Sequence, residues 1–172
     1  MWDFSQFSER TALICEQKCL SYRELAEIST EIASAIPSRA PVFLLARNSP
    51  AAIAGYVGFV QNGIVPVMID ATLDAGLLTA LRAAYRPCYA WVPAERAEEF
   101  QPSREVLRHD AYVLLDLEEK SPFPLHDDLA ILMTTSGSTG SPKLVRQSYR
   151  NLRANTEAII DYLHLTAADR AI

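Results

Sequence analysis

The stretch ILMTTSGSTGSPKLVRQSYRN, residues 131–151, places a loop of small, polar side chains directly after a short apolar run. Hydroxyl residues, two glycines, a proline and a lysine fill the positions Thr135–Lys143. The apolar residues Leu129–Met133 before the loop predict a buried strand, and Lys143–Gln147 after it favours extended chain. A strand that runs into such a loop is typical of a ligand-binding edge in an α/β sheet.

The same alternation of short apolar runs with helical patterns extends through the rest of the chain. Strands alternating with helices predict a mostly parallel α/β sheet that is flanked by helices on both faces. The predicted strands are 42–46, 64–69 (broken by Pro66), 88–92 and 129–133, with extended pieces at 11–19 and a hairpin over 105–117; the predicted helices are 21–36, 50–63, 74–85, 93–101 and 148–163.

Local signals fix several of these boundaries. Ser21 and Glu24 have the spacing of a capping box, which starts a helix. Ser49 precedes a proline that the first helical turn tolerates, and Gly63 suits the end of that helix. The last predicted helix carries an apolar side formed by Leu152, Ile159, Ile160 and Leu163.

Composition narrows the class of protein. The chain has 172 residues, enough for one domain with its own core, and a formal net charge of −5 argues against a nucleic-acid-binding face. Its three cysteines lack the neighbours of a zinc site, and neither a secretory leader nor a membrane-spanning run is visible. We therefore expect a cytoplasmic protein with no metal ligands of its own. Residues 121–128 (SPFPLHDD) are predicted to be a proline-bearing linker before the loop strand.

The loop itself has the chemistry of an anion site. Gly137 and Gly140 allow positive φ and a close approach of the backbone, so successive amides can form an anion-binding nest. Lys143 adds a positive charge. Side-chain donors that match phosphate oxygens come from Thr135, Ser136, Ser138 and Thr139.

Two other interpretations of the loop are weaker. The P-loop of NTPases requires glycine before its lysine and Ser or Thr after it, whereas Pro142 and Leu144 flank Lys143 here. The following LVRQ also favours a strand where that motif needs a helix. A flexible glycine-serine linker is the remaining alternative, but such linkers rarely join two buried strands.

Three ordered motifs resemble those of the adenylate-forming (AMP-binding) enzymes, the superfamily of acyl-CoA synthetases, adenylation domains of non-ribosomal peptide synthetases and firefly luciferase. TSGSTGSPK at Thr135–Lys143, followed by Val145 and by YRNL at Tyr149–Leu152, resembles the family's TSGSTGxPKG, Val and HxNL. LSYREL at Leu20–Leu25 resembles L[TS]YxEL, and QNGIVPVMID at Gln61–Asp70 resembles the family's KAGxxxVPID-like strand.

The resemblance implies that ATP, with magnesium, and a carboxylic acid give an acyl-adenylate and pyrophosphate. The acyl group then passes to the thiol of coenzyme A or of a carrier protein's phosphopantetheine. It also implies that the loop contacts the β- and γ-phosphates through Thr135, Ser136, Gly137, Ser138, Thr139, Gly140 and Lys143.

Not every matching residue suggests chemistry. For Tyr22, Glu24 and Asp70 we expect capping and packing roles, and His109, His126 and His164 lie outside the motifs. Two positions depart from the family pattern, Leu144 for its glycine and Tyr149 for its histidine.

The acyl pocket, adenine loop, ribose-binding aspartate and mobile C-terminal domain of the family have no counterpart in this sequence. We therefore expect residues 1–172 to be the N-terminal subdomain of a longer ligase, with no catalytic residue of its own and no turnover alone. The alternative from another class is a non-catalytic binding or regulatory module that keeps the fold.

Overall fold

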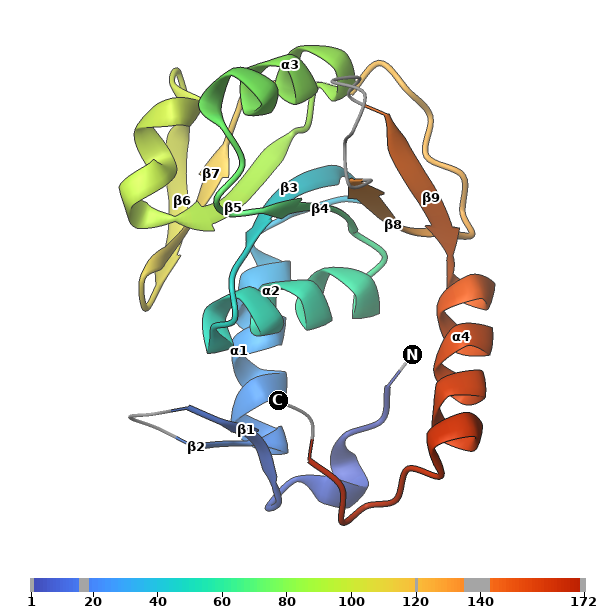
Figure 1. Cartoon of the computed structure of the whole chain (residues 1–172). Coiled ribbons are helices and arrows are strands. Elements are labelled where there is room, and N and C mark those ends of the chain that lie inside the picture. The colour runs from blue at the N-terminus through green and yellow to red at the C-terminus, as the bar shows by residue number, and fades with distance from the viewer. Residues whose placement is uncertain (1, 16–18, 120, 135–142, 171–172) are drawn as a thin grey trace.

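The computed structural model describes residues 2–15, 19–119, 121–134 and 143–170. Figure 1 shows a sheet in the upper part of the molecule with helices on both of its faces. In chain order the elements are η1 (Ser5–Phe7), β1 (Thr11–Ile14), β2 (Cys19–Ser21), α1 (Tyr22–Ser34), β3 (Pro41–Ala46), α2 (Pro50–Gln61), β4 (Val65–Asp70), α3 (Ala75–Tyr85), β5 (Tyr89–Pro93), η2 (Ala94–Phe100), β6 (Arg104–His109), β7 (Tyr112–Asp116), β8 (Leu129–Thr134), β9 (Leu144–Ser148) and α4 (Tyr149–Leu163).

The main sheet has seven strands in the order β6-β7-β5-β3-β4-β8-β9. Its four central strands, β5, β3, β4 and β8, are parallel, as the sequence predicts. Both edges are antiparallel: β7 pairs with β5 and β6 on one side, and β9 pairs with β8 on the other. A short antiparallel pair, β1 and β2, forms a separate sheet.

Successive residues of β3 point to opposite faces of the sheet and enter two different cores. Val42 and Leu44 join the core under α1 and α2, whereas Phe43 and Leu45 join the core under α3 and η2. The side chain of Trp91 is fully buried in the first core, where its indole N–H donates to the Ala51 carbonyl oxygen at 2.9 Å. Central strands buried on both faces explain their continuous apolar sequences.

The helix boundaries follow the local signals. Ser21 and Glu24 form the predicted capping box: the Glu24 amide donates to the Ser21 hydroxyl, and the Ser21 amide donates to the Glu24 carboxylate. The Ser49 hydroxyl caps α2, and Gly63 adopts φ +74° just after that helix. The Asp74 carboxylate caps α3.

Pro66 does not break β4, contrary to the prediction. It pairs with Val42 of β3, whereas the pairing of β4 with β8 begins only at Val67. One side of the strand is therefore open at Pro66, and a residue without an N–H group loses no ladder hydrogen bond there.

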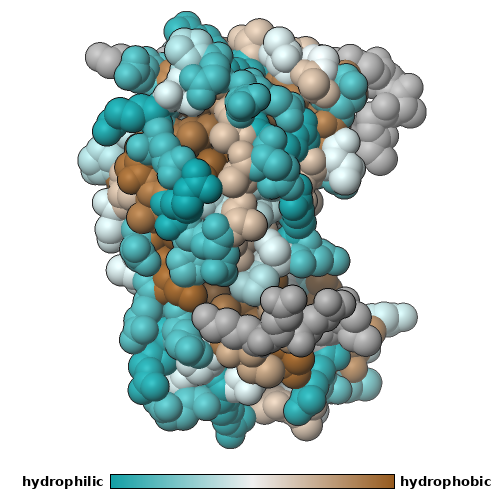
Figure 2. All heavy atoms as spheres, turned by 90° about the vertical axis from the view of Figure 1, so that its left-hand side faces the viewer, coloured by the Kyte–Doolittle hydropathy of each residue, from teal (hydrophilic) through white to brown (hydrophobic). Residues whose placement is uncertain are grey.

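The open edge strand β6 exposes charged side chains, among them Arg104, Glu105 and Arg108. Figure 2 shows that side of the molecule as mostly hydrophilic, with hydrophobic residues gathered in a band. Charges along an edge strand discourage pairing with another chain. In the residues that the structure describes, no helix is long and apolar enough to span a membrane.

Helix α4 begins as predicted, with Ser148 and Asn151 forming a second capping box. Its predicted apolar side is only partly covered. Leu152 packs against a small core formed by Val60, Ala130 and Ile131, but Ile159, Ile160 and Leu163 remain exposed at 44%, 45% and 56%. Figure 1 shows α4 standing at the side of the molecule, below β9.

Candidate functional site

The loop that the sequence singles out joins β8 to the antiparallel strand β9. Because β8 is parallel to β4, β3 and β5, the loop leaves the sheet at the edge where the parallel strands end, which is where ligands of α/β sheets bind. Of the seven predicted phosphate contacts the structure describes Lys143. Thr135, Ser136, Gly137, Ser138, Thr139 and Gly140 lie outside the described residues.

The two ends of the loop are held by different parts of the fold. At the start, the Thr134 hydroxyl donates to the Met68 carbonyl oxygen at 3.4 Å, which ties the end of β8 to β4. At the other end, Lys143 is exposed and immediately precedes β9. The lysine side chain is therefore accessible at the edge where the parallel strands end.

Leu144, which replaces the glycine of the family pattern, fixes the backbone next to Lys143. Its side chain is half-buried and packs against the core under α3. Its N–H donates to the hydroxyl of Tyr85, the last residue of α3, at 3.1 Å. The departure from glycine thus adds an apolar anchor at this point.

Tyr149, which replaces the family's histidine, joins β9 and α4 to the rest of the fold. Its hydroxyl donates to the Val60 carbonyl oxygen of α2 at 3.1 Å. Its ring packs with Leu152 against the small core of Val60, Ala130 and Ile131. In these contacts Tyr149 has a structural role, since it holds the start of α4 against α2.

Asp70 is exposed at the carboxyl end of β4, on the same edge as the loop. Its carboxylate accepts hydrogen bonds from the Thr72 hydroxyl and the Thr72 amide, both at 2.7 Å. These bonds favour the charged form and lower the pKa of Asp70. The contacts agree with the local structural role that we expect for this residue.

Tyr22 and the three histidines also make local contacts. The Tyr22 ring lies 5.4 Å from that of Phe4. His109 lies near Asp110, His126 accepts a hydrogen bond from the Asp128 amide, and His164 follows α4 as its C-cap. Within the described residues, no group of three or more His, Cys, Asp or Glu side chains is arranged to hold a metal ion.

Four basic residues follow one another in the sequence from the end of the loop to α4. Lys143, Arg146, Arg150 and Arg153 are all exposed. Arg153 forms an ion pair with Glu157, one turn further along α4, at 2.8 Å. Arg153 is thus an exposed positive charge on α4 whose ion-pair partner is Glu157.

A small apolar cavity of about 210 Å³ lies on the α2 side of the same edge. The sequence did not predict this cavity, because its walls come from β3, α2 and β4, which are separate segments of the chain. Burial of one wall residue, Tyr56, raises the pKa of its hydroxyl. The lining residues are Leu44, Ala46, Arg47, Ala52, Ile53, Tyr56 and Met68.

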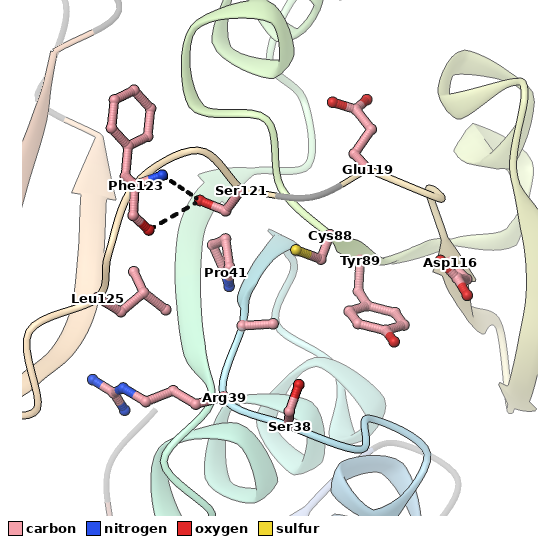
Figure 3. Close-up of a pocket in the computed structure, with 11 residues that line it drawn as sticks. Ser38, Arg39, Pro41, Cys88, Tyr89, Asp116, Glu119, Ser121, Phe123 and Leu125 are labelled. Atoms are coloured by element: carbon pink, nitrogen blue, oxygen red, sulfur yellow. Dashed lines mark hydrogen bonds between the residues drawn. The ribbon is translucent and has the colours of Figure 1, made fainter.

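A larger hollow of about 490 Å³ lies at the opposite edge, where β3 and β5 begin, and Figure 3 shows its lining side chains. The acidic groups at this hollow are already paired: Asp116 with Arg104 at 3.0 Å, and Glu119 with Arg82 at 3.2 Å. Burial, and then the charge of Asp116, raise the pKa of Tyr89. The hollow lies at the amino ends of the parallel strands, whereas the loop leaves the sheet at their carboxyl ends.

Comparison with known proteins relates this chain to a family. A sequence model of the family described as AMP-binding enzyme matches residues 2–172. The 3-hydroxybenzoate–CoA/4-hydroxybenzoate–CoA ligase of Thauera aromatica is 26% identical over 94% of this chain, which spans 36% of that ligase. The D-alanine–D-alanyl carrier protein ligase of Staphylococcus epidermidis is 26% identical over 82% of this chain, which spans 29% of it.

The fold is also found in solved structures. The o-succinylbenzoate CoA synthetase of Bacillus subtilis, in complex with its acyl-adenylate intermediate, matches 97% of this chain with a TM-score of 0.74 and 21% identity. The match covers 46% of the synthetase chain. A second structure of that synthetase holds ATP and a magnesium ion. On the match of the family model over nearly the whole sequence, this chain belongs to the AMP-binding enzyme family.

Proposed function

We propose that this chain forms the phosphate-binding part of an ATP-dependent acid–thiol ligase. In this reaction a carboxylate oxygen attacks the α-phosphorus of ATP, the bond from that phosphorus to the β-phosphate oxygen breaks, and pyrophosphate leaves. A thiol then attacks the acyl carbon of the acyl-adenylate, and AMP leaves. The observation that carries the proposal is the exposed Lys143 at the carboxyl edge of the sheet, at the end of a loop rich in phosphate donors.

In this proposal, Lys143 lies near the β- and γ-phosphates, where negative charge grows as pyrophosphate departs. A cation and donors aimed at that charge stabilise the transition state more than the ground state. The companion contacts are the hydroxyls and amides of Thr135, Ser136, Gly137, Ser138, Thr139 and Gly140.

Magnesium fits this arrangement as a partner of the nucleotide. Mg²⁺ usually keeps several waters and is held by substrate phosphates with one or two carboxylates. The described residues contain no three-ligand cluster, so we propose that the ion enters on the phosphates of ATP. Its chemistry there is to neutralise phosphate charge.

The proposed substrates are a carboxylic acid and a thiol, which is that of coenzyme A or of an acyl or peptidyl carrier protein. Both acceptors occur among the relatives, since one is named as a CoA ligase and another as a carrier protein ligase. No nucleic acid is expected as a partner, and cytoplasmic location stays a prediction.

We further propose that this chain does not turn over alone and needs the C-terminal remainder of a longer enzyme. The chain spans 36% of the Thauera ligase and 46% of the Bacillus synthetase. The cavity of about 210 Å³ at the loop edge is also smaller than the roughly 300–1,000 Å³ of usual ligand pockets. The alternative is a binding or regulatory module that keeps the fold without catalysis.

Binding of magnesium pyrophosphate to the chain, measured by calorimetry, tests the phosphate site. We expect binding by the unaltered chain and a loss of about tenfold or more in Lys143→Ala, because a hydrogen bond to a charged group contributes roughly 1.5–3 kcal/mol. Arg153→Ala is the control for net charge, since it also removes one exposed positive charge, but from a side chain on α4 that pairs with Glu157. No binding, or equal losses in both variants, would refute a specific phosphate contact by Lys143.

Exchange of labelled pyrophosphate into ATP tests the enzymatic part. The product of the full reading frame that contains this chain is expected to catalyse exchange with its acid, whereas the chain alone is not. Absence of exchange from a folded full-length product with any acid of a broad panel would favour the non-catalytic module. Exchange by the chain alone would overturn the proposed dependence on a C-terminal remainder.

A further inference from the structure

The hydrogen bond between Tyr85 and Leu144 connects two segments that are far apart in the sequence. The Leu144 N–H donates to the Tyr85 hydroxyl at 3.1 Å across 59 residues of chain. Leu144 is bonded covalently to Lys143, so this contact fixes the main chain next to the ammonium-bearing side chain. Figure 1 shows the end of α3 close to the start of β9.

The end of α3 is a firm support for this bond. Arg82, one turn before Tyr85, forms an ion pair with Glu119 at 3.2 Å, and its side chain is only 18% exposed. Its guanidinium also lies 6.0 Å from the centre of the Phe100 ring. Arg86, which adopts a left-handed conformation after the helix, lies 3.5 Å from Glu119. A rigid support of this kind is what precise placement of a functional group requires.

Packing supports the same contact from the other side. Tyr85 and Leu144 both pack, half-buried, against the core under α3. Leu144 is therefore held in two independent ways, by the packing of its side chain and by the hydrogen bond of its N–H to Tyr85. A glycine at this position would retain the N–H but lose the apolar contact.

We propose that Tyr85 is a positioning residue for Lys143, acting through the main chain of Leu144; this rests on the proposed contact of Lys143 with phosphate. The hydroxyl holds the strand start in place, so that less conformational freedom is lost when the lysine binds an anion. Tyr85 itself need not touch the ligand.

A double-mutant cycle on the full chain tests the proposal with magnesium pyrophosphate as the probe. The proteins are the unaltered chain, Tyr85→Phe, Lys143→Ala and the double variant. Tyr85→Phe keeps the ring and removes one hydroxyl, so we expect an affinity loss of about two- to tenfold, the range for one neutral hydrogen bond. In the Lys143→Ala background the same change is expected to have no further effect, because coupled residues are not additive.

Tyr149→Phe is the matched control. It also removes one tyrosine hydroxyl that bonds to the main chain over 3.1 Å, although this hydroxyl donates, to the Val60 carbonyl oxygen, whereas that of Tyr85 accepts. The Tyr149 bond anchors α4 and does not involve the residue beside Lys143. Its pyrophosphate affinity is expected to equal that of the unaltered chain. Circular dichroism at the binding temperature establishes that every variant is folded, so that affinities are compared between native proteins.

The outcomes separate the two proposals. If Lys143→Ala binds as well as the unaltered chain, the proposed function fails and this inference fails with it. If Lys143→Ala weakens binding but Tyr85→Phe does not, only the positioning role is overturned. Equal losses from Tyr85→Phe in both backgrounds, or a matching loss in Tyr149→Phe, would also overturn it, because they would indicate a general structural effect.

Discussion

Gly58 allows α1 and α2 to approach closely, and its replacement by alanine should be costly. A methyl group at this position would lie 2.2 Å from the Ser29 carbonyl oxygen, whereas ordinary contact begins at 3.4 Å. The helices would have to separate by about 1.2 Å, because the obstacle is main chain and cannot rotate away. A radial gap near 1 Å forfeits roughly a quarter to a half of the dispersion energy at each contact.

The free-energy change follows from two opposing effects. Overpacking costs about 1–3 kcal/mol, and we take the upper end because a backbone oxygen is the neighbour. The higher helix propensity of alanine offsets about 1 kcal/mol of this cost. Gly58→Ala is therefore expected to lower the free energy of unfolding by about 2 kcal/mol.

Urea unfolding followed by tryptophan fluorescence measures this change, with Gly76→Ala as the control. With a slope of about 2 kcal/mol per molar urea, the Gly58→Ala midpoint should fall by about 1 M. A methyl group at Gly76 would lie 3.0 Å from the Asp74 carboxylate that caps α3, so a side chain would have to shift by only a few tenths of an ångström. Because alanine's higher helix propensity offsets strain at the cap, the Gly76→Ala midpoint should fall far less than that of Gly58→Ala. A Gly58→Ala midpoint that does not fall would refute the argument that the helices are in backbone contact.

Two further stability predictions concern polar side chains that are partly or fully buried. The Arg39 guanidinium donates to the carbonyl oxygens of Gly63 and Leu129, the latter at 2.6 Å, so Arg39→Ala should cost about 2 kcal/mol in urea unfolding. Arg23→Ala, which loses only an exposed ion pair, should cost less than about 1 kcal/mol, and equal losses would contradict this reasoning. Burial raises the pKa of Tyr112, so the unfolded chain releases this proton first and stability falls as pH rises above about 10. Tyr112→Phe should make that alkaline decline of the urea midpoint shallower, and an unchanged slope would exclude Tyr112 as a contributor.

The sequence was most informative where a structure depends on neighbours along the chain. The capping box of Ser21 and Glu24 and the helix end at Gly63 involve residues a few positions apart, so their spacing predicts the contacts. The prediction that Pro66 breaks its strand was wrong, because the effect of this proline depends on residues that are distant in the chain. Whether a proline costs a ladder hydrogen bond depends on which neighbouring strand is present beside it, and the local sequence does not contain that information.

The candidate site also combines features that the sequence predicts with contacts that only the structure shows. The sequence predicts an anion site at the loop, because glycines, hydroxyls and a lysine at fixed spacing suit phosphate. The resemblance to the AMP-binding family, also seen in the sequence, is confirmed by the family model. The partners of Leu144 and Tyr149 could not be predicted, since Tyr85 and Val60 lie 59 and 89 residues away. The sequence by itself determined the central parallel strands, most helix boundaries and the family. Only the tertiary structure decided the antiparallel edges and the anchors beside Lys143, because burial and pairing between distant segments are properties of the assembled sheet.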